Sequence, residues 1–304
     1  MTRKRKKIII AVLAVVIGLP LALMATILAW MSMSDRTNGT IVSSGETRRY
    51  LLYVPKTYDR SKPSPLVISM HGGAMWPAQQ MKLSRWNRLA DERGFIVVYP
   101  SGTGFPKSWG GEQDVKFISV LIDKLEAEYN IDAARVYADG FSNGGGMALE
   151  VSCGLSRRVA AVGAVSAALL RPVKGCEDSR PVPTMAFHGT ADPLAPYQGG
   201  TSPASPPGTG MPFLAVRDWV ASRVRVNRCG PNPVESVVAA DVNRLEYTNC
   251  ADDAAVVLYT IKGEGHQWPG GKPLPEWFLG PANHSIDATS LLWAFFVQHP
   301  RGPK

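Results

Sequence analysis

The chain has 304 residues, 45% of them hydrophobic and 19% charged, which is the composition of an ordinary globular protein. This length is sufficient for one large α/β domain with a buried core. Five of the positive charges behind the formal net charge of +8 lie at residues 3–7, and taking these five away leaves +3 for the rest of the chain. Because no basic face interleaved with aromatic residues remains, a nucleic acid is not expected as a partner.

The N-terminal segment has the pattern of a membrane-targeting leader helix. An apolar run from Ile8 to Met31 follows the basic cluster, and about 20 apolar residues are enough to cross a bilayer. The positive charges are expected to keep the N-terminus in the cytoplasm and to send the rest of the chain outward. Residues 1–34 are predicted to be either a cleaved signal peptide or an uncleaved signal anchor. The anchor, which would contact the membrane, is slightly favoured because no A-x-A cleavage site precedes Ser34.

Beyond the leader, short apolar runs alternate with amphipathic stretches. This pattern predicts an α/β fold with a mostly parallel central sheet and helices on both faces. The predicted strands are 49–54, 66–70, 95–99, 135–138, 159–165, 184–187 and 255–261, and the predicted helices are 80–93, 115–129, 143–153, 212–226 and 287–298. Residues 198–210 are rich in Gly, Pro, Ser and Thr and predict a surface loop. No repeat or second-domain boundary is evident, so residues 35–304 are predicted to form a single domain.

The four cysteines fit an exported chain. Their even number favours disulfides over metal ligation. Of the three possible connectivities, the sequence-local pairing of Cys153 with Cys176 and of Cys229 with Cys250 is preferred, because each bond closes a short loop. No metal site is predicted, since the chain has no C-x-x-C pair with a nearby histidine set. No organic cofactor is implied either.

A candidate nucleophile lies between the strand 135–138 and the helix 143–153. Residues 140–144 read G-x-S-x-G with Ser142 at the centre. A serine on a tight turn between a strand and a helix is the nucleophile elbow of the α/β-hydrolase fold. The flanking glycines permit the strained turn. The pentapeptide alone is weak evidence, and its structural setting and its downstream partners carry the hypothesis.

An acid and a base follow Ser142 in the order that this fold requires. Asp192 comes after the strand 184–187 and His266 comes after the strand 255–261. His266 is predicted to take the proton of Ser142 and to return it to the leaving alcohol, while Asp192 orients the imidazole. Other aspartates lie between Ser142 and His266 without closing a clear buried strand: Asp178, Asp218, Asp241, Asp252 and Asp253.

The remaining histidines are weaker candidates. His284 lies in a predicted loop and is the rival of His266. His299, at the end of the last helix, is expected to be solvated. His71 and His188 each begin an H-G turn after a strand, and both are expected to shape those turns.

Acyl transfer also requires hydrogen-bond donors for the oxyanion. One is predicted to be the backbone N–H of Asn143, the residue after the nucleophile. The second is expected from the turn after the strand 66–70, and the sequence leaves open whether Gly73 or Ala74 supplies it. Aromatic residues in nearby loops predict a substrate pocket, although packing under the loops explains each of them equally well. These residues are Trp76, Trp109, Trp268, Trp277 and Phe278, with Trp268 favoured because it lies two positions from His266.

Several motifs occur together in one order. They are VISMHGG at 67–73, DVKFI at 114–118, RVYADGFSNGG at 135–145, HGTADP at 188–193 and GHQWPG at 265–270. In this the chain resembles the polyhydroxybutyrate depolymerase/feruloyl esterase family of secreted esterases, over roughly residues 50–296. The resemblance implies an α/β-hydrolase fold, triad roles for the matching Ser142, Asp192 and His266, and half-cystines at the four cysteines. The segment 103–111 is shorter than in many members of this family.

The predicted function is that of an exported serine carboxylesterase working through an acyl-enzyme. The expected partner is an ester substrate, either a hydroxyalkanoate oligomer or a feruloyl or acetyl ester of plant polysaccharides. Two alternatives remain: a serine peptidase of the same fold, and a non-catalytic surface binding protein of this fold. The second is disfavoured because a binding protein has no need for a complete serine, aspartate and histidine set.

Overall fold

The computed structural model describes residues 35–302, except 177, 204 and 206–208. The leader predicted at residues 1–34 lies outside this range. In the described range, no helix is both long enough and apolar enough to cross a membrane. The folded unit begins at Thr37.

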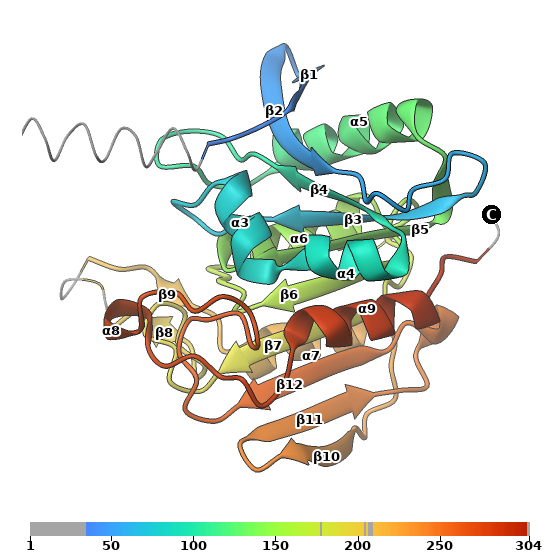
Figure 1. Cartoon of the computed structure of the whole chain (residues 1–304). Helices are drawn as coiled ribbons and strands as arrows, with labels where there is room; N and C mark the ends of the chain where they lie inside the picture. Colours follow the sequence, from blue (N-terminus) through green and yellow to red (C-terminus); the bar gives the residue numbers. More distant parts are fainter. Residues whose placement is uncertain (1–34, 177, 204, 206–208, 303–304) are drawn as a thin grey trace, which may run out of the picture. The chain divides into compact units, whose positions relative to one another are not determined.

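A ten-stranded sheet forms the centre of this unit, in the order β1-β2-β4-β3-β5-β6-β7-β12-β11-β10 (Figure 1). The six central strands from β4 to β12 are parallel, and the pairings outside them on both sides are antiparallel. The strands are β1 Gly39–Ser43, β2 Glu46–Tyr53, β3 Ser64–Met70, β4 Ile96–Pro100, β5 Ile131–Phe141, β6 Ala161–Val165, β7 Thr184–Gly189, β10 Val234–Ala239, β11 Val242–Tyr247 and β12 Val256–Ile261. The predicted α/β fold with a mostly parallel sheet is confirmed.

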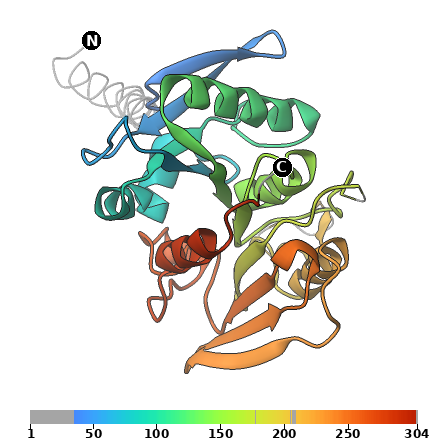
Figure 2. The ribbon, with the colours of Figure 1, turned by 90° about the vertical axis from the view of Figure 1, so that its right-hand side faces the viewer.

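Helices cover both faces of the sheet, as Figure 2 shows from the side. Apolar residues of α5, α6 and α7 pack in one core cluster, and those of α3, α4 and α9 pack in the cluster on the other face. The helices are α3 Pro77–Ser84, α4 Trp86–Arg93, α5 Glu112–Glu128, α6 Asn143–Gly154, α7 Val216–Val226, α8 Glu276–Leu279 and α9 Ala288–Gln298, with a 3-10 turn at Ala251–Asp253. Burial on both faces explains why the central strands are continuously apolar.

Two helix predictions need correction. The stretch 80–93 is not one helix, because Arg85 adopts a left-handed conformation (φ 60°) that ends α3 and separates it from α4. The helix predicted at 212–226 begins only at Val216. Ahead of it, Pro212–Phe213 (β9) pairs with Gly200–Thr201 (β8), which lies in the predicted surface loop.

Both disulfides have the sequence-local pairing. Cys153, in the last turn of α6, is bonded to Cys176 in the segment after β6. Cys229, just after α7, is bonded to Cys250 after β11. Disulfides of this kind form in oxidising compartments outside the cytoplasm. The structure therefore agrees with an extracytoplasmic domain.

Candidate active site

Ser142 lies on a sharp turn between β5 and α6. Its backbone has φ 55° and ψ −120°, which is rare for a residue other than glycine and is a strained conformation that occurs at functional sites. Ser142 is partly buried. A Cβ atom on Gly140 would overlap the carbonyl of Gly144, and one on Gly144 would overlap the carbonyls of Met70 and His71. The turn therefore requires glycine on both sides of the serine.

Asp192 and His266 form a buried pair at the same end of the sheet. The Nδ1 atom of His266 lies 2.7 Å from Oδ2 of Asp192, and both side chains are almost completely buried. Because a carboxylate only accepts hydrogen bonds, Nδ1 carries the proton and Nε2 is left free to accept one. The imidazole packs against Phe141, which immediately precedes Ser142, with 4.8 Å between ring centroids.

The carboxylate of Asp192 is held by further donors. The backbone N–H groups of Leu194 and Ala195 both donate to Oδ1 at 2.8 Å. Burial would raise the pKa of Asp192, but the charge of His266 and the contacts with His188 and His266 outweigh it and hold that pKa well below its ordinary value. The acid therefore stays ionised.

His188 also contacts Asp192, a role that the sequence did not predict. Its Nε2 atom lies 2.8 Å from the carbonyl oxygen of Ala195 and 3.3 Å from Oδ2 of Asp192. Both neighbours are acceptors, so Nε2 carries the proton. The only sequence signal is the spacing, because His188 begins the H-G-T-A-D motif that ends at Asp192. His188 thus shapes the turn, as predicted, and also faces the acid.

Ser142 and His266 lie near each other without a hydrogen bond between their side chains. Within the described residues, no hydrogen bond joins the Ser142 hydroxyl to the imidazole, although Phe141 brings the ring beside the turn. Contacts of this kind are often loose in unliganded enzymes and tighten when substrate binds. The rival His284 is exposed.

The predicted oxyanion donors lie beside the nucleophile. A Cβ atom on Gly72 would be 3.4 Å from Cβ of Ser142, and one on Gly73 would be 3.7 Å from Cβ of Asn143. The N–H of Ala74 already donates to the carbonyl of Lys107 at 2.7 Å. Of the two candidates that the sequence left open, Gly73 is the one whose N–H has no acceptor among the described residues. Asn143 begins α6, where backbone N–H groups lack intrahelical partners.

A cleft of about 1030 Å³ runs along α6 from Asn143, the residue after the nucleophile, and its lining includes neither Ser142 nor His266. Of the predicted pocket residues, Trp109 lines this cleft together with Asn143. Trp268 lies in the core with 2% of its surface exposed and donates to Thr289, which leaves it almost no surface for a substrate. Trp76 and Trp109 are also buried, with 7% and 6% of their surfaces exposed, so Trp109 offers the cleft only a small part of its surface. Trp277 and Phe278 are exposed. Met147, Leu169 and other apolar side chains form much of the cleft wall.

A sheet covered on both faces, a serine on a strand–helix turn and a buried acid–imidazole pair after two later strands define a serine hydrolase of the α/β-hydrolase fold. Residues 48–227 match the family described as "Esterase PHB depolymerase", and the chain belongs to this family of esterases.

Named relatives agree with this assignment, and a solved structure shares the fold. The chain is 30% identical to feruloyl esterase C of Emericella nidulans over 268 residues, which cover 86% of this chain and 87% of the relative. It is 35% identical over 156 residues to a bifunctional acetylxylan esterase/xylanase of Neocallimastix patriciarum, covering 51% of this chain and 23% of that protein. A ferulic acid esterase structure from Anaeromyces mucronatus shares the fold, with a TM-score of 0.55, 16% identity and coverage of 87% of this chain and 90% of that one.

Proposed function

We propose that Ser142, His266 and Asp192 form the catalytic triad of this esterase. The observation that carries the proposal is the buried hydrogen bond between Asp192 and His266 beside the strained turn of Ser142. In this scheme Nε2 of His266 accepts the hydroxyl proton as Ser142 attacks the ester carbonyl. The alcohol leaves with that proton, and water activated by the same nitrogen then releases the acid from the acyl-enzyme.

The negative charge that forms on the carbonyl oxygen is assigned to two backbone donors, Asn143 and Gly73. The free N–H of Gly73 supports this choice over Ala74, whose N–H is already bonded to Lys107. Donors of this kind stabilise the transition state more than the substrate, because the charge is present only there.

The substrate class is an ester with an extended acyl or alcohol portion. The cleft along α6 is far larger than an acetyl group needs. Its walls combine aliphatic side chains, Met147 and Leu169 among them, with one aromatic residue, Trp109. They also carry charged side chains, at Glu112, Lys116, Glu150, Arg171 and Lys174. This lining favours hydroxyalkanoate oligomers, and feruloyl esters are the second candidate because the relative from Emericella nidulans is named for them. The proposed location is extracytoplasmic, with membrane contact only through an uncleaved leader.

Active-site labelling and a substrate panel test the proposal. A fluorophosphonate should label the native protein and should fail to label Ser142→Ala, whereas the exposed control Ser61→Ala should label normally. The native protein should hydrolyse p-nitrophenyl butyrate, methyl ferulate and hydroxybutyrate oligomers to different extents, and Ser142→Ala should hydrolyse none. An unlabelled native protein would support the surface binding alternative, and cleavage of peptide bonds without ester hydrolysis would support the peptidase.

A further inference from the structure

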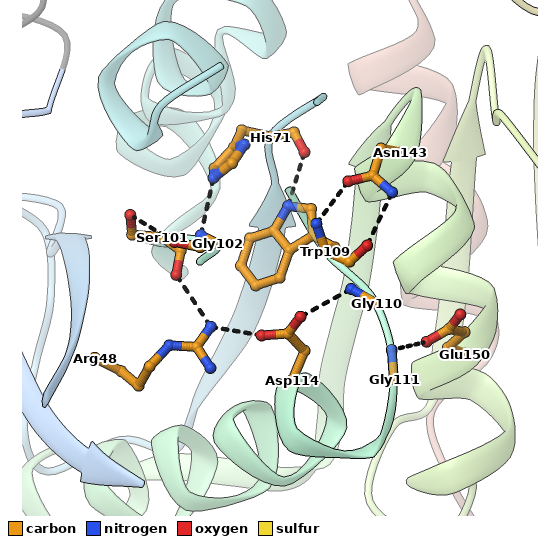
Figure 3. A network of polar contacts seen from close by, with 10 residues as sticks. All are labelled: Arg48, His71, Ser101, Gly102, Trp109, Gly110, Gly111, Asp114, Asn143 and Glu150. Atoms are coloured by element: carbon orange, nitrogen blue, oxygen red, sulfur yellow. Dashed lines mark hydrogen bonds and ion pairs between the residues drawn. The ribbon is translucent and has the colours of Figure 1, made fainter. Parts of the chain in front are cut away.

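We propose that the buried ion pair between Arg48 and Asp114 is a positioning element for the oxyanion site. It acts through the segment 101–111, called here the support loop, which contacts the backbone on both sides of that site. The inference rests on the proposed function, since it concerns the donors assigned to Asn143 and Gly73. None of these contacts was predicted from the sequence, and Figure 3 draws those of Arg48, Asp114, His71 and Asn143 with the support loop.

The ion pair itself is short and buried. The Nη2 atom of Arg48 lies 2.6 Å from Oδ1 of Asp114, and the two side chains are 5% and 4% exposed. The guanidinium also lies 4.0 Å from the centre of the Phe117 ring. Because desolvation offsets most of the attraction in such a pair, it adds little stability over well-packed apolar residues. A function in holding other groups in place is therefore a stronger reason for its presence.

Both ends of the support loop are fastened to this pair. Arg48 Nη2 donates to the carbonyl of Ser101 at 3.2 Å, where the loop leaves β4. The second carboxylate oxygen of Asp114 accepts the N–H of Gly110 at 2.8 Å, just before α5 begins. One ion pair thus fixes the start and the end of the loop relative to β2 and α5.

The support loop in turn holds the turn that contains Gly73. The N–H of Gly102 donates to Nε2 of His71 at 2.9 Å, and the indole N–H of Trp109 donates to the His71 carbonyl at 2.9 Å. The carbonyl of Lys107 accepts the N–H of Ala74. These contacts bracket Gly73 on both sides. Burial lowers the pKa of His71 to about 4, so its ring stays neutral and Nε2 remains an acceptor near neutral pH.

The same loop holds the other donor. The backbone N–H of Trp109 donates to Oδ1 of Asn143 at 2.7 Å, and Nδ2 of Asn143 donates to the Trp109 carbonyl at 3.1 Å. This two-point pairing, visible in Figure 3, fixes the first residue of α6 against the loop. A single loop therefore sets the separation of the two N–H groups that would bind the oxyanion.

The consequence is a specific kinetic signature. Loss of one oxyanion donor costs about 10²- to 10³-fold in kcat, so a displacement of the donors should cost less than this and should act mainly on kcat. An asparagine at position 114 can offer its oxygen to Arg48 or to Gly110 but not to both, so Asp114→Asn must break one fastening. We expect a loss in kcat of about 10- to 100-fold, below the cost of losing a whole donor, with KM changed less than about threefold.

The experiment compares Asp114→Asn with Asp123→Asn, the same substitution on the exposed side of the same helix. Measurements are kcat and KM for p-nitrophenyl butyrate, the inhibition constant of a trifluoromethyl ketone, whose adduct carries the oxyanion, and the melting temperature. A third variant, Trp109→Phe, keeps an aromatic ring but removes the donor to His71, and should cost about threefold to tenfold in kcat. If Asp114→Asn fails to fold, Trp109→Phe still tests the support loop, through which the ion pair is proposed to act.

The expected result is a parallel loss of kcat and of ketone affinity in Asp114→Asn and Trp109→Phe, with native values in Asp123→Asn. The inference is overturned if the folded variants keep kcat and ketone affinity within twofold of the native values. The same holds if their melting temperature falls while kcat and ketone affinity stay native. Labelling of the native protein distinguishes failure of the positioning role from failure of the proposed function. A protein that is labelled at Ser142 and unaffected by these variants refutes only the positioning role, whereas an unlabelled native protein refutes the proposed function.

Discussion

Replacement of Asp192 by asparagine is the most demanding test of the site. In the native protein Oδ1 accepts two backbone N–H groups, from Leu194 and Ala195. The amide oxygen of the variant must take this place, because an NH₂ group there would face two donors. The NH₂ group then takes the place of Oδ2, which is 2.7 Å from Nδ1 of His266.

An NH₂ group at that position can only donate, so it forces the proton of His266 from Nδ1 to Nε2. The imidazole can then no longer accept the proton of Ser142. We expect Asp192→Asn to lower kcat by about 10⁴-fold, as in other triads with this change, which is about 5.4 kcal/mol of barrier height. The NH₂ group also faces the Nε2–H of His188, which adds a second unfavourable contact.

The assay is the initial rate of p-nitrophenyl butyrate hydrolysis at saturating substrate, with the rate of fluorophosphonate labelling as a second readout. Asp123→Asn, whose side chain is 62% exposed, serves as the matched control and should keep the native rate. A folded Asp192→Asn protein that retains more than a tenth of native kcat would mean that Asp192 does not set the tautomer of the base.

Three further outcomes are expected. The double variant Cys153→Ser/Cys176→Ser removes a disulfide whose cysteines are 23 residues apart in sequence. Loop-closure entropy gives such a bond a stabilisation of about 3 kcal/mol. Calorimetry should therefore show a melting temperature lower by about 6–12 °C, and an unchanged melting temperature would argue against that bond. Burial raises the pKa of Glu264 to about 8 from 4.5, so the unfolded state ionises first and the free energy of unfolding should fall between these pH values. Denaturant titrations at pH 5 and 8 should show a smaller fall in Glu264→Gln, and equal falls would refute this. Gly144→Ala places a methyl group against the carbonyls of Met70 and His71. Because this overlap displaces the turn of Ser142, it should abolish labelling of Ser142. Labelling at the native rate would contradict the close approach of Gly144 to these carbonyls.

The sequence predicted the centre of the fold well because buried parallel strands need continuous apolar runs. Apart from the helix that is split at Arg85, the predicted strands and helices agree with the structure to within four residues at each end. The outer strands β1, β10 and β11 were missed because they are partly exposed and their polar residues hide the pattern. The break at Arg85 was missed because a left-handed arginine leaves no mark in the sequence.

The candidate site was predictable where it depends on topology. The ends of parallel strands meet at one edge, so a residue after β7 and a residue after β12, which are neighbouring strands, can come into contact, as Asp192 and His266 do. Contacts that depend on loop conformation were not predictable. The second partner of Asp192, the support loop and the burial of Trp268 belong to this group, because side chains distant in sequence determine them. The catalytic roles themselves stay predictions.

The Cys153–Cys176 bond connects the end of α6 to the segment 168–175, which forms one wall of the cleft. The same helix starts at Asn143, the residue after the nucleophile. The disulfide therefore restrains the distance between this helix and the opposite wall of the cleft. Protein made in a reducing cytosol would lack this restraint on that wall. Heterologous production by oxidative export is therefore the appropriate route, and turnover of long esters should suffer from dithiothreitol before turnover of short ones does.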